Sequence, residues 1–536
     1  LSDGLPLAGN EPAGFGLLQT PPLDLERVEV VKGAASAQYG GSGLGGVVNL
    51  TSRRPDGEPE LLLNRSSLGA SDAVAFGGAG ISSSAGWTLT GAASLQERED
   101  VDDDGWADLA KSERLMVRPR FYYDDEAGRQ LYMTAGYMNE DRDGGTMPGA
   151  TLPGGGTFVD ALHTQRVDAG AVGRLVLDGA RIAGARFSVV VSDHDRTYGD
   201  TRVRDSRTTT FGEVTLAGHR SGHSWLAGAA FDGDRLETSD VPGVGYSYAV
   251  PAVFVQDEFA ASDRILLSAS GRIDWHSDYG TFFSPRVAAI FLPAEGWSIR
   301  ASAGSGFSAP SPFVDEIETV GLAPLDPLAG LVAERAVNAS LDLQWTGGPW
   351  EANFSVFGSE VRHALDLRAG SSPGRLELFN DAGPLRVRGV EALVRYVDGA
   401  LHVIGSYTRL DATESAGAGV RRDVDRIPRQ SGELAALLED ESRGRIGVEV
   451  SWTGTQALQD NPYRTGSPSY FELNALAELK IGEAAVFLNA INLTDERQTR
   501  FDPLLRPSPG PAGQPVTELW APIAGRVFNL GVRLEF

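Results

Sequence analysis

The sequence RVFNLGVRLEF, residues 526–536, alternates between apolar and polar positions without interruption. Successive side chains of a strand point to opposite faces, so one face carries only apolar side chains and the other only small or polar ones. The apolar face comprises Phe528, Leu530, Val532, Leu534 and Phe536, and the other Asn529, Gly531, Arg533 and Glu535. A strand of this kind, ending in an aromatic residue, suits the wall of a membrane β-barrel, where one face meets lipid and the other a polar lumen.

Further segments repeat this alternation along the chain. Examples are ASLDLQW at 339–345, RIGVEVSW at 445–452 and FELNALAELKI at 471–481. A soluble β-sandwich would also alternate in this way, because one face of each of its sheets packs against a core. Alternation by itself therefore leaves both folds open.

The connections between the segments favour the barrel. Very short links, such as 221–222, 262–263, 347–349 and 398–399, take turns with long polar excursions at 99–112, 143–165, 308–335 and 498–524. Short turns on one rim and long loops on the other are typical of outer-membrane barrels, whose long loops lie outside the cell. We count about 22 segments from Glu60 to Phe536, and a barrel of that size has a lumen wide enough to need a plug.

The sequence thus predicts an all-β membrane protein, a 22-stranded antiparallel transmembrane barrel with a partial plug domain in its lumen. We assign residues 1–54 to the C-terminal part of the plug and residues 55–536 to the barrel. We expect a monomer, surrounded by outer-membrane lipid and inserted by the barrel-assembly machinery.

Composition excludes several other classes of protein. The net charge of -25, from 47 Lys and Arg against 72 Asp and Glu, repels phosphate backbones and argues against a nucleic-acid partner. The chain has no cysteine, which excludes disulfides, zinc-thiolate sites and cysteine nucleophiles. No apolar run approaches the roughly 20 residues that a spanning helix needs. No catalytic constellation stands out, so we expect no enzyme and no cofactor.

At residues 25–55, the sequence LERVEVVKGAASAQYGGSGLGGVVNLTSRRP resembles the end of the plug domain of TonB-dependent outer-membrane receptors. Further landmarks of that family follow in order, including VFVQDEF from 253, GSGFSAPSP from 304 and FLNAINLTDER from 487. The plug of the family is considerably longer than the segment here, and its N-terminal TonB box is absent. We therefore expect that an N-terminal part, including any export signal, is missing from this sequence.

The resemblance implies active import across the outer membrane of a Gram-negative bacterium. In this family TonB and its inner-membrane energising complex act on the plug, and the substrate, most often a ferric siderophore, binds the outer loops. Our candidates for substrate-facing residues are polar or aromatic side chains at outer strand ends: Tyr137, Arg142, Asp274, His276, Tyr279 and Arg362. Haem receptors of the family carry a histidine after the FxAP motif, whereas residues 311–335 have none.

Other functions stay open at this stage. A shortened plug could leave a passive diffusion pore, the substrate could be cobalamin or an oligosaccharide, and a further N-terminal domain would make the chain a surface sensor. Conductance in planar bilayers distinguishes a pore from a plugged importer.

Two charged groups have both a functional and a simpler interpretation. Arg27 and Lys32 of the plug are candidates to contact acids on the wall such as Glu391, or they are merely hydrated. The sequence DVDDDGWAD, residues 100–108, resembles a calcium loop, or it is a solvated acidic loop. Its candidate ligands are Asp100, Asp102, Asp104, the Trp106 carbonyl and Asp108, but Lys111 stands where the bidentate Glu of such a loop is expected.

Overall fold

The computed structural model describes residues 1–7, 20–33, 45–55, 58–152, 155–314, 321–417, 419–510 and 513–536. The middle of the stretch that carries the family resemblance, residues 34–44, lies outside this range. Within the described part, the N-terminal segment forms the short helix η1 (Pro22–Asp24) and a two-stranded sheet of β1 (Leu25–Lys32) and β2 (Gly46–Ser52).

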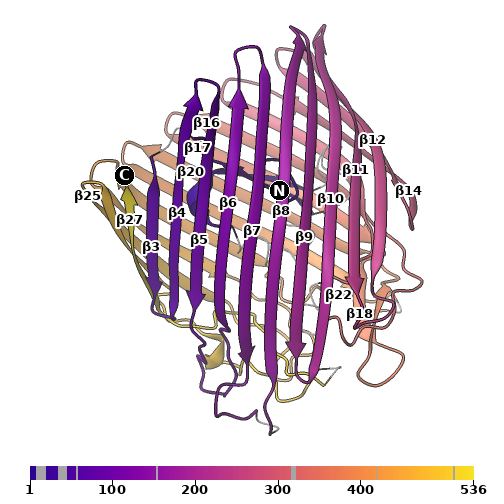
Figure 1. Cartoon of the computed structure of the whole chain (residues 1–536), viewed down its shortest axis with the longest axis vertical. Helices are drawn as coiled ribbons and strands as arrows, with labels where there is room; N and C mark the ends of the chain where they lie inside the picture. Colours follow the sequence, from indigo (N-terminus) through magenta and orange to yellow (C-terminus); the bar gives the residue numbers. More distant parts are fainter. Residues whose placement is uncertain are drawn as a thin grey trace.

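The remaining strands close into a barrel, and Figure 1 shows its tilted strands. Within the described residues, 22 antiparallel strands form the wall, as predicted. They are β3 (Glu60–Ser66), β4 (Ala70–Ser82), β5 (Ala85–Gln96), β6 (Lys111–Asp124), β7 (Arg129–Gly145), β8 (Val159–Asp178), β9 (Arg181–Tyr198), β10 (Thr201–Arg220), β11 (His223–Thr238), β12 (Tyr246–Ser262), β13 (Ile265–His276), β14 (Gly280–Phe291), β15 (Trp297–Ser308), β16 (Glu334–Gly347), β17 (Trp350–Arg362), β20 (Leu385–Asp398), β21 (Leu401–Ser415), β23 (Gln430–Asp440), β24 (Gly444–Thr453), β25 (Tyr470–Ile481), β26 (Ala484–Ile491) and β27 (Val527–Glu535).

The two rims differ in the length of their connections. One rim, at the top of Figure 1, carries short turns such as Ser221-Gly222, where both residues have positive φ (51° and 82°) as a two-residue hairpin requires. The other rim carries the long loops, which contain the extra elements β18 (Leu365–Ala369), β19 (Leu376–Asn380), β22 (Arg421–Asp423) and η3 (Gln498–Arg500). We refer to these as the short-turn rim and the long-loop rim.

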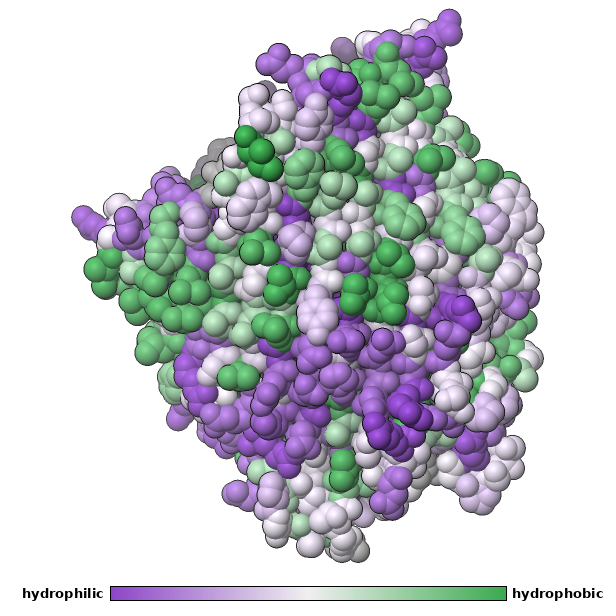
Figure 2. Space-filling model, viewed as in Figure 1, coloured by the Kyte–Doolittle hydropathy of each residue, from purple (hydrophilic) through white to green (hydrophobic). Residues whose placement is uncertain are grey.

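The wall presents apolar side chains outward and polar ones to the lumen. In β7, Met133 is 42% exposed on the outside, whereas its neighbour Thr134 points inward and is buried. In β27, Phe528 and Leu530 are exposed on the outside and Arg533 pairs with Glu478 of β25. Figure 2 shows hydrophobic side chains gathered over the middle and upper wall, with a hydrophilic zone toward the long-loop rim. This distribution matches a barrel whose outer belt faces hydrocarbon.

Helices contribute little to the molecule. Among the described residues, no helix has the length and apolar character needed to cross a membrane.

The N-terminal segment is held against lumen-facing residues of the wall. Leu5 and Leu7 are buried and pack on Tyr122 of β6 and Tyr132 of β7. The Tyr132 hydroxyl donates to the Asp3 carboxylate at 2.7 Å. These contacts place the start of the chain beside β6 and β7, consistent with the position of the N-terminus in Figure 1.

Candidate functional site: the mouth of the lumen

Four aromatic side chains gather at the long-loop ends of β12 and β13. We call Tyr246, Tyr248, His276 and Tyr279 the mouth cluster. The Tyr246 and Tyr248 rings stack at 4.4 Å, and the Tyr248 ring lies 4.8 Å from His276 and 5.7 Å from Tyr279. The Tyr248 and Tyr279 hydroxyls lie 3.2 Å apart. Alternation puts these side chains on the lumen face, because Trp275, next to His276, is 43% exposed on the outer face. Such a cluster can stack on a flat aromatic ligand.

Buried ion pairs support the mouth cluster from the lumen side of the wall. Arg272 donates to Asp274 at 2.7 Å and lies 3.2 Å from Asp232, and both Arg272 and Asp274 are almost fully buried. Arg207 pairs with Asp234 at 2.5 Å, and the Tyr246 hydroxyl donates to the same carboxylate. The Arg207–Asp234 pair joins the neighbouring strands β10 and β11 and, through the hydrogen bond from Tyr246, fixes the position of that ring.

The structure places the six candidate residues in three different settings. Asp274, His276 and Tyr279 lie in or directly beneath the mouth cluster. Arg142 also faces the lumen, but it belongs to a separate group in which it donates to Glu140 at 2.8 Å. The prediction was wrong for the other two residues, because Tyr137 and Arg362 lie on the outer face of the wall and do not face the lumen.

The two outward residues have partners on that same outer face. The Tyr137 hydroxyl accepts a hydrogen bond from Gln165, and Arg362 pairs with Glu360. Sequence reasoning also missed Tyr246 and Tyr248, although the alternation YSY at 246–248 offered a signal.

Among the described residues, the ion pairs that join the plug to the wall include a buried one and an exposed one. Asp24 and Arg120 lie 2.7 Å apart, with only 1% and 3% of their side chains exposed. Lys32 lies 2.5 Å from Glu391, but 73% of its side chain is exposed. Arg27 does not reach the wall and pairs with Glu29 on its own strand. Lys32 and Glu391 therefore form an ion pair between plug and wall, whereas the prediction that Arg27 contacts the wall was wrong.

The acidic loop, residues 100–108, brings three of its carboxylates together. Oxygen atoms of Asp100, Asp102 and Asp108 all lie within 4.8 Å of one another. Asp104 stands apart from this group and accepts a hydrogen bond from the Trp106 amide at 2.8 Å. One oxygen each of Asp102 and Asp104 is buried without a hydrogen-bond partner.

Burial changes the ionisation of the acidic loop. Loss of solvent, reinforced by the neighbouring carboxylates, raises the pKa of Asp108 to about 7. The same cause raises the pKa of Asp102. A divalent cation would relieve this repulsion, and carboxylates are the ligands that Ca²⁺ prefers.

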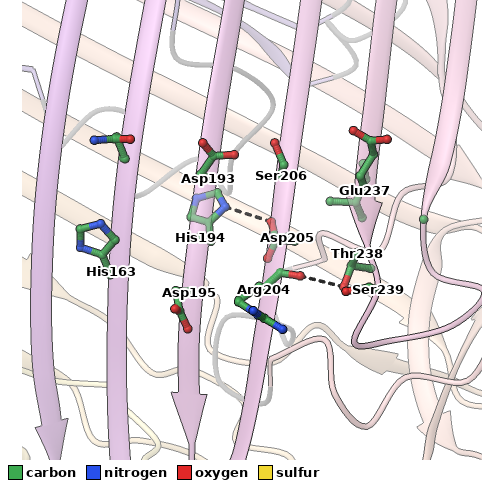
Figure 3. A pocket seen from close by; sticks show the side chains of 13 residues that line it. His163, Asp193, His194, Asp195, Arg204, Asp205, Ser206, Glu237, Thr238 and Ser239 are labelled. Atoms are coloured by element: carbon green, nitrogen blue, oxygen red, sulfur yellow. Dashed lines mark hydrogen bonds and ion pairs between the residues drawn. The ribbon is translucent and has the colours of Figure 1, made fainter.

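A polar pocket also crosses β8 to β11 near the long-loop rim (Figure 3). Its inward-pointing members include the His194–Asp205 pair, 3.0 Å apart. On its outward side, His163 pairs with Asp141 and Arg204 with Asp240. Because its charged side chains pair with one another, this pocket belongs to the polar zone of the wall outside the hydrophobic belt.

The closed barrel, the plug segment inside it and the aromatic mouth define a receptor of the outer membrane. The family profile "TonB dependent receptor-like, beta-barrel" matches residues 48–493, and the profile "TonB-dependent Receptor Plug Domain" matches residues 1–47. The chain belongs to the TonB-dependent receptor family.

The names of two relatives refer to iron. The iron-regulated outer membrane virulence protein of Vibrio cholerae (classical Ogawa strain) is 25% identical over 365 residues, which cover 64% of this chain and 54% of the relative. The ferric enterobactin receptor PirA of Pseudomonas aeruginosa is 23% identical over 455 residues, covering 69% and 60%. The chain therefore spans little more than half of the length of these relatives.

Solved structures share the fold. The siderophore receptor PirA of Acinetobacter baumannii superposes with a TM-score of 0.76 at 13% identity, covering 97% of this chain and 86% of that one. The ferric-catecholate import receptor Fiu of E. coli gives a TM-score of 0.73 at 14% identity, covering 96% and 86%.

Proposed function

We propose that this chain is the barrel and partial plug of an importer of the outer membrane. It carries a ferric siderophore across that membrane with energy transmitted by TonB. The observation that carries this proposal is the mouth cluster, which gathers four aromatic rings at the long-loop end of the lumen. The names of the relatives, which include receptors for siderophores and for ferric enterobactin, support the same substrate class.

The proposed mechanism needs binding and gating but no bond-making chemistry. Flat aromatic ligand groups of a ferric complex stack on Tyr246 and Tyr248, while the ion pairs beneath hold these rings in position. TonB then draws on the plug, and the Asp24–Arg120 pair must separate before the lumen opens along β6.

Uptake of radioactive iron tests the proposal. A strain lacking the gene is complemented with wild type, Tyr248→Ala or the outward-facing control Tyr137→Ala, and is offered ferric siderophores, cobalamin and oligosaccharides. We expect wild type and the control to restore uptake of a ferric siderophore, and Tyr248→Ala to weaken it. Uptake that persists without TonB would instead indicate a diffusion pore, and restored uptake of cobalamin or an oligosaccharide alone would reassign the substrate.

We further propose that the acidic loop binds one Ca²⁺ through Asp100, Asp102 and Asp108. The close approach of these carboxylates and the buried Asp102 oxygen without a partner support this assignment. Calorimetric titration of the purified protein with Ca²⁺, with Asp108→Asn as the variant and Asp103→Asn as the control, tests it. Equal heats for both variants would contradict the proposal.

A further inference from the structure

The wall contains one seam where two long strands pair along only half of their length. β14 pairs with β13 over all of its 12 residues, and β15 pairs with β16 over all of its 12 residues. Between β14 and β15, however, register pairs run only from Arg286–Gly304 to Phe291–Ile299. Residues 280–285 and 305–308 therefore face each other without a ladder, and all of them belong to the described part of the chain. We call this gap the seam.

The sequence explains why the ladder stops here. Pro285 directly follows the last paired position of β14 toward the long-loop rim, and proline has no N–H to donate to a neighbouring strand. Ser284, the next residue, has a buried hydroxyl without a hydrogen-bond partner. The edges thus separate at a residue that cannot continue a ladder.

Aromatic side chains fill the seam. The Phe282 and Phe307 rings stack at 3.8 Å with an interplanar angle of 6°, and both residues are buried together with Ala333. The Arg335 guanidinium lies 5.1 Å from the centre of the Phe282 ring. The two strand edges are thus joined at this level by apolar contact, which another apolar group can replace without a loss of hydrogen bonds.

The seam connects the hydrophobic belt with the mouth cluster. On its outer side, Phe283 is 63% exposed and Val337 is 59% exposed, as expected for side chains that meet hydrocarbon. On its inner side, Tyr279 packs against the Phe282–Phe307 pair and also contacts Tyr248 and His276 of the mouth cluster. Aromatic side chains therefore lie on the bilayer side of the seam, between its edges and at the mouth cluster.

We propose that the seam admits the acyl tail of an amphiphilic ferric siderophore while the iron-bearing head occupies the mouth cluster. This inference rests on the proposed import function and specifies its substrate class. A hydrocarbon tail needs no hydrogen bonds, so it can replace the apolar contact between Phe282 and Phe307 that fills the seam. Each methylene that leaves water strengthens binding by about fourfold, equivalent to about 0.8 kcal/mol.

The first test measures the width of the seam. The chain has no cysteine, so Phe283→Cys with Ser305→Cys gives a spin-label pair across the seam, and Ala303→Cys with Ala339→Cys gives a control pair across a paired edge. Ferric tris-catecholate and ferric tris-hydroxamate chelates, each with and without a dodecanoyl tail, are added to the protein in lipid nanodiscs. We expect the acylated form of one chelate to lengthen the distance across the seam, and the control distance to stay constant.

The second test closes the seam covalently. Phe282→Cys with Phe307→Cys is cross-linked by a short bis-maleimide, and a heat-modifiability gel establishes that the barrel is folded. We expect wild type to bind the acylated chelate at least tenfold more tightly than the tail-free form, and the cross-linked variant to bind both alike.

The outcomes separate the two proposals. If tail-free chelates bind but a tail neither widens the seam nor strengthens binding, the seam inference is wrong and the import function stands. The same conclusion follows if cross-linking leaves the tail's advantage unchanged, or if only an extended peptide widens the seam. If no chelate of either class binds, the proposed siderophore function fails, and the seam inference fails with it.

Discussion

Breaking the buried pair between Asp24 and Arg120 should loosen the plug far more than breaking the exposed pair between Lys32 and Glu391. Removing one partner of an ion pair as buried as Asp24–Arg120 leaves a charge without compensation and costs about 3–5 kcal/mol. An exposed pair contributes below about 1 kcal/mol, and most of the Lys32 side chain is exposed. We therefore expect Asp24→Asn to increase opening of the plug about 150-fold to 5,000-fold, and Lys32→Met to have an effect below about fivefold.

Hydrogen exchange of the β1 and β2 amides in the purified protein measures this opening directly. The double variant Asp24→Asn with Arg120→Gln should lose less protection than the sum of the single variants, because neither buried charge then lacks a partner. Equal exchange rates for Asp24→Asn and Lys32→Met would refute the reasoning, because burial would then not decide the strength of the pair.

Three further predictions concern the mouth, the acidic loop and the closing strand. Tyr248→Ala should weaken binding of the imported ferric complex by about tenfold through lost stacking, measured by fluorescence quenching, while Tyr137→Ala has no effect. Because burial raises the pKa of Asp108 to about 7, its neutral form stabilises the calcium-free acidic loop at low pH, and this stability is lost as the pH rises through 7. Exchange protection of the loop should fall accordingly between pH 5 and pH 8, and either Ca²⁺ or Asp108→Asn should remove the fall. Gly531→Ala would place a Cβ 2.2 Å from the Phe487 ring and should lower the unfolding free energy of the barrel by about 1–3 kcal/mol, seen as a lower transition in a heat-modifiability gel.

Alternation predicted the fold because the bilayer imposes it on every wall strand. Within the hydrophobic belt, apolar side chains must face outward, so the pattern of β27 and β24 identified both the strands and their orientation. The strand count followed from the same regularity.

Outside the hydrophobic belt, the alternation of apolar and polar residues no longer distinguishes the outer face from the lumen face. Two of the predicted substrate-facing residues were wrong for this reason. Near the long-loop rim both faces of the wall meet water, so polar residues on either face look alike in the sequence. Arg362 and Tyr137 were chosen in that region and point outward. The predicted loop at 143–165 is shorter than expected for the same reason, because β7 runs to Gly145 and β8 starts at Val159.

Pairing between the plug and the wall could be anticipated only in part. Lys32 was a candidate as a charged residue of the plug, and Glu391 as an acid on the face of the wall that the pattern assigns to the lumen. Asp24 was missed, since it belongs to η1 rather than to an alternating strand and its burial depends on how η1 meets β6. The sequence alone does not show which charged residue becomes buried when two distant segments pack together.

The junction of β27 with β3 sets the order in which this molecule can fold. The Phe528 amide and the Ser67 hydroxyl, which meet beside this junction, are 461 residues apart in sequence. Chain-closure entropy disfavours so distant an encounter until the intervening hairpins have formed, since each neighbouring hairpin costs far less to close. The barrel therefore forms hairpin by hairpin, and its two terminal strands pair last. Until that step, the open sheet has unpaired edges that must be protected from other chains.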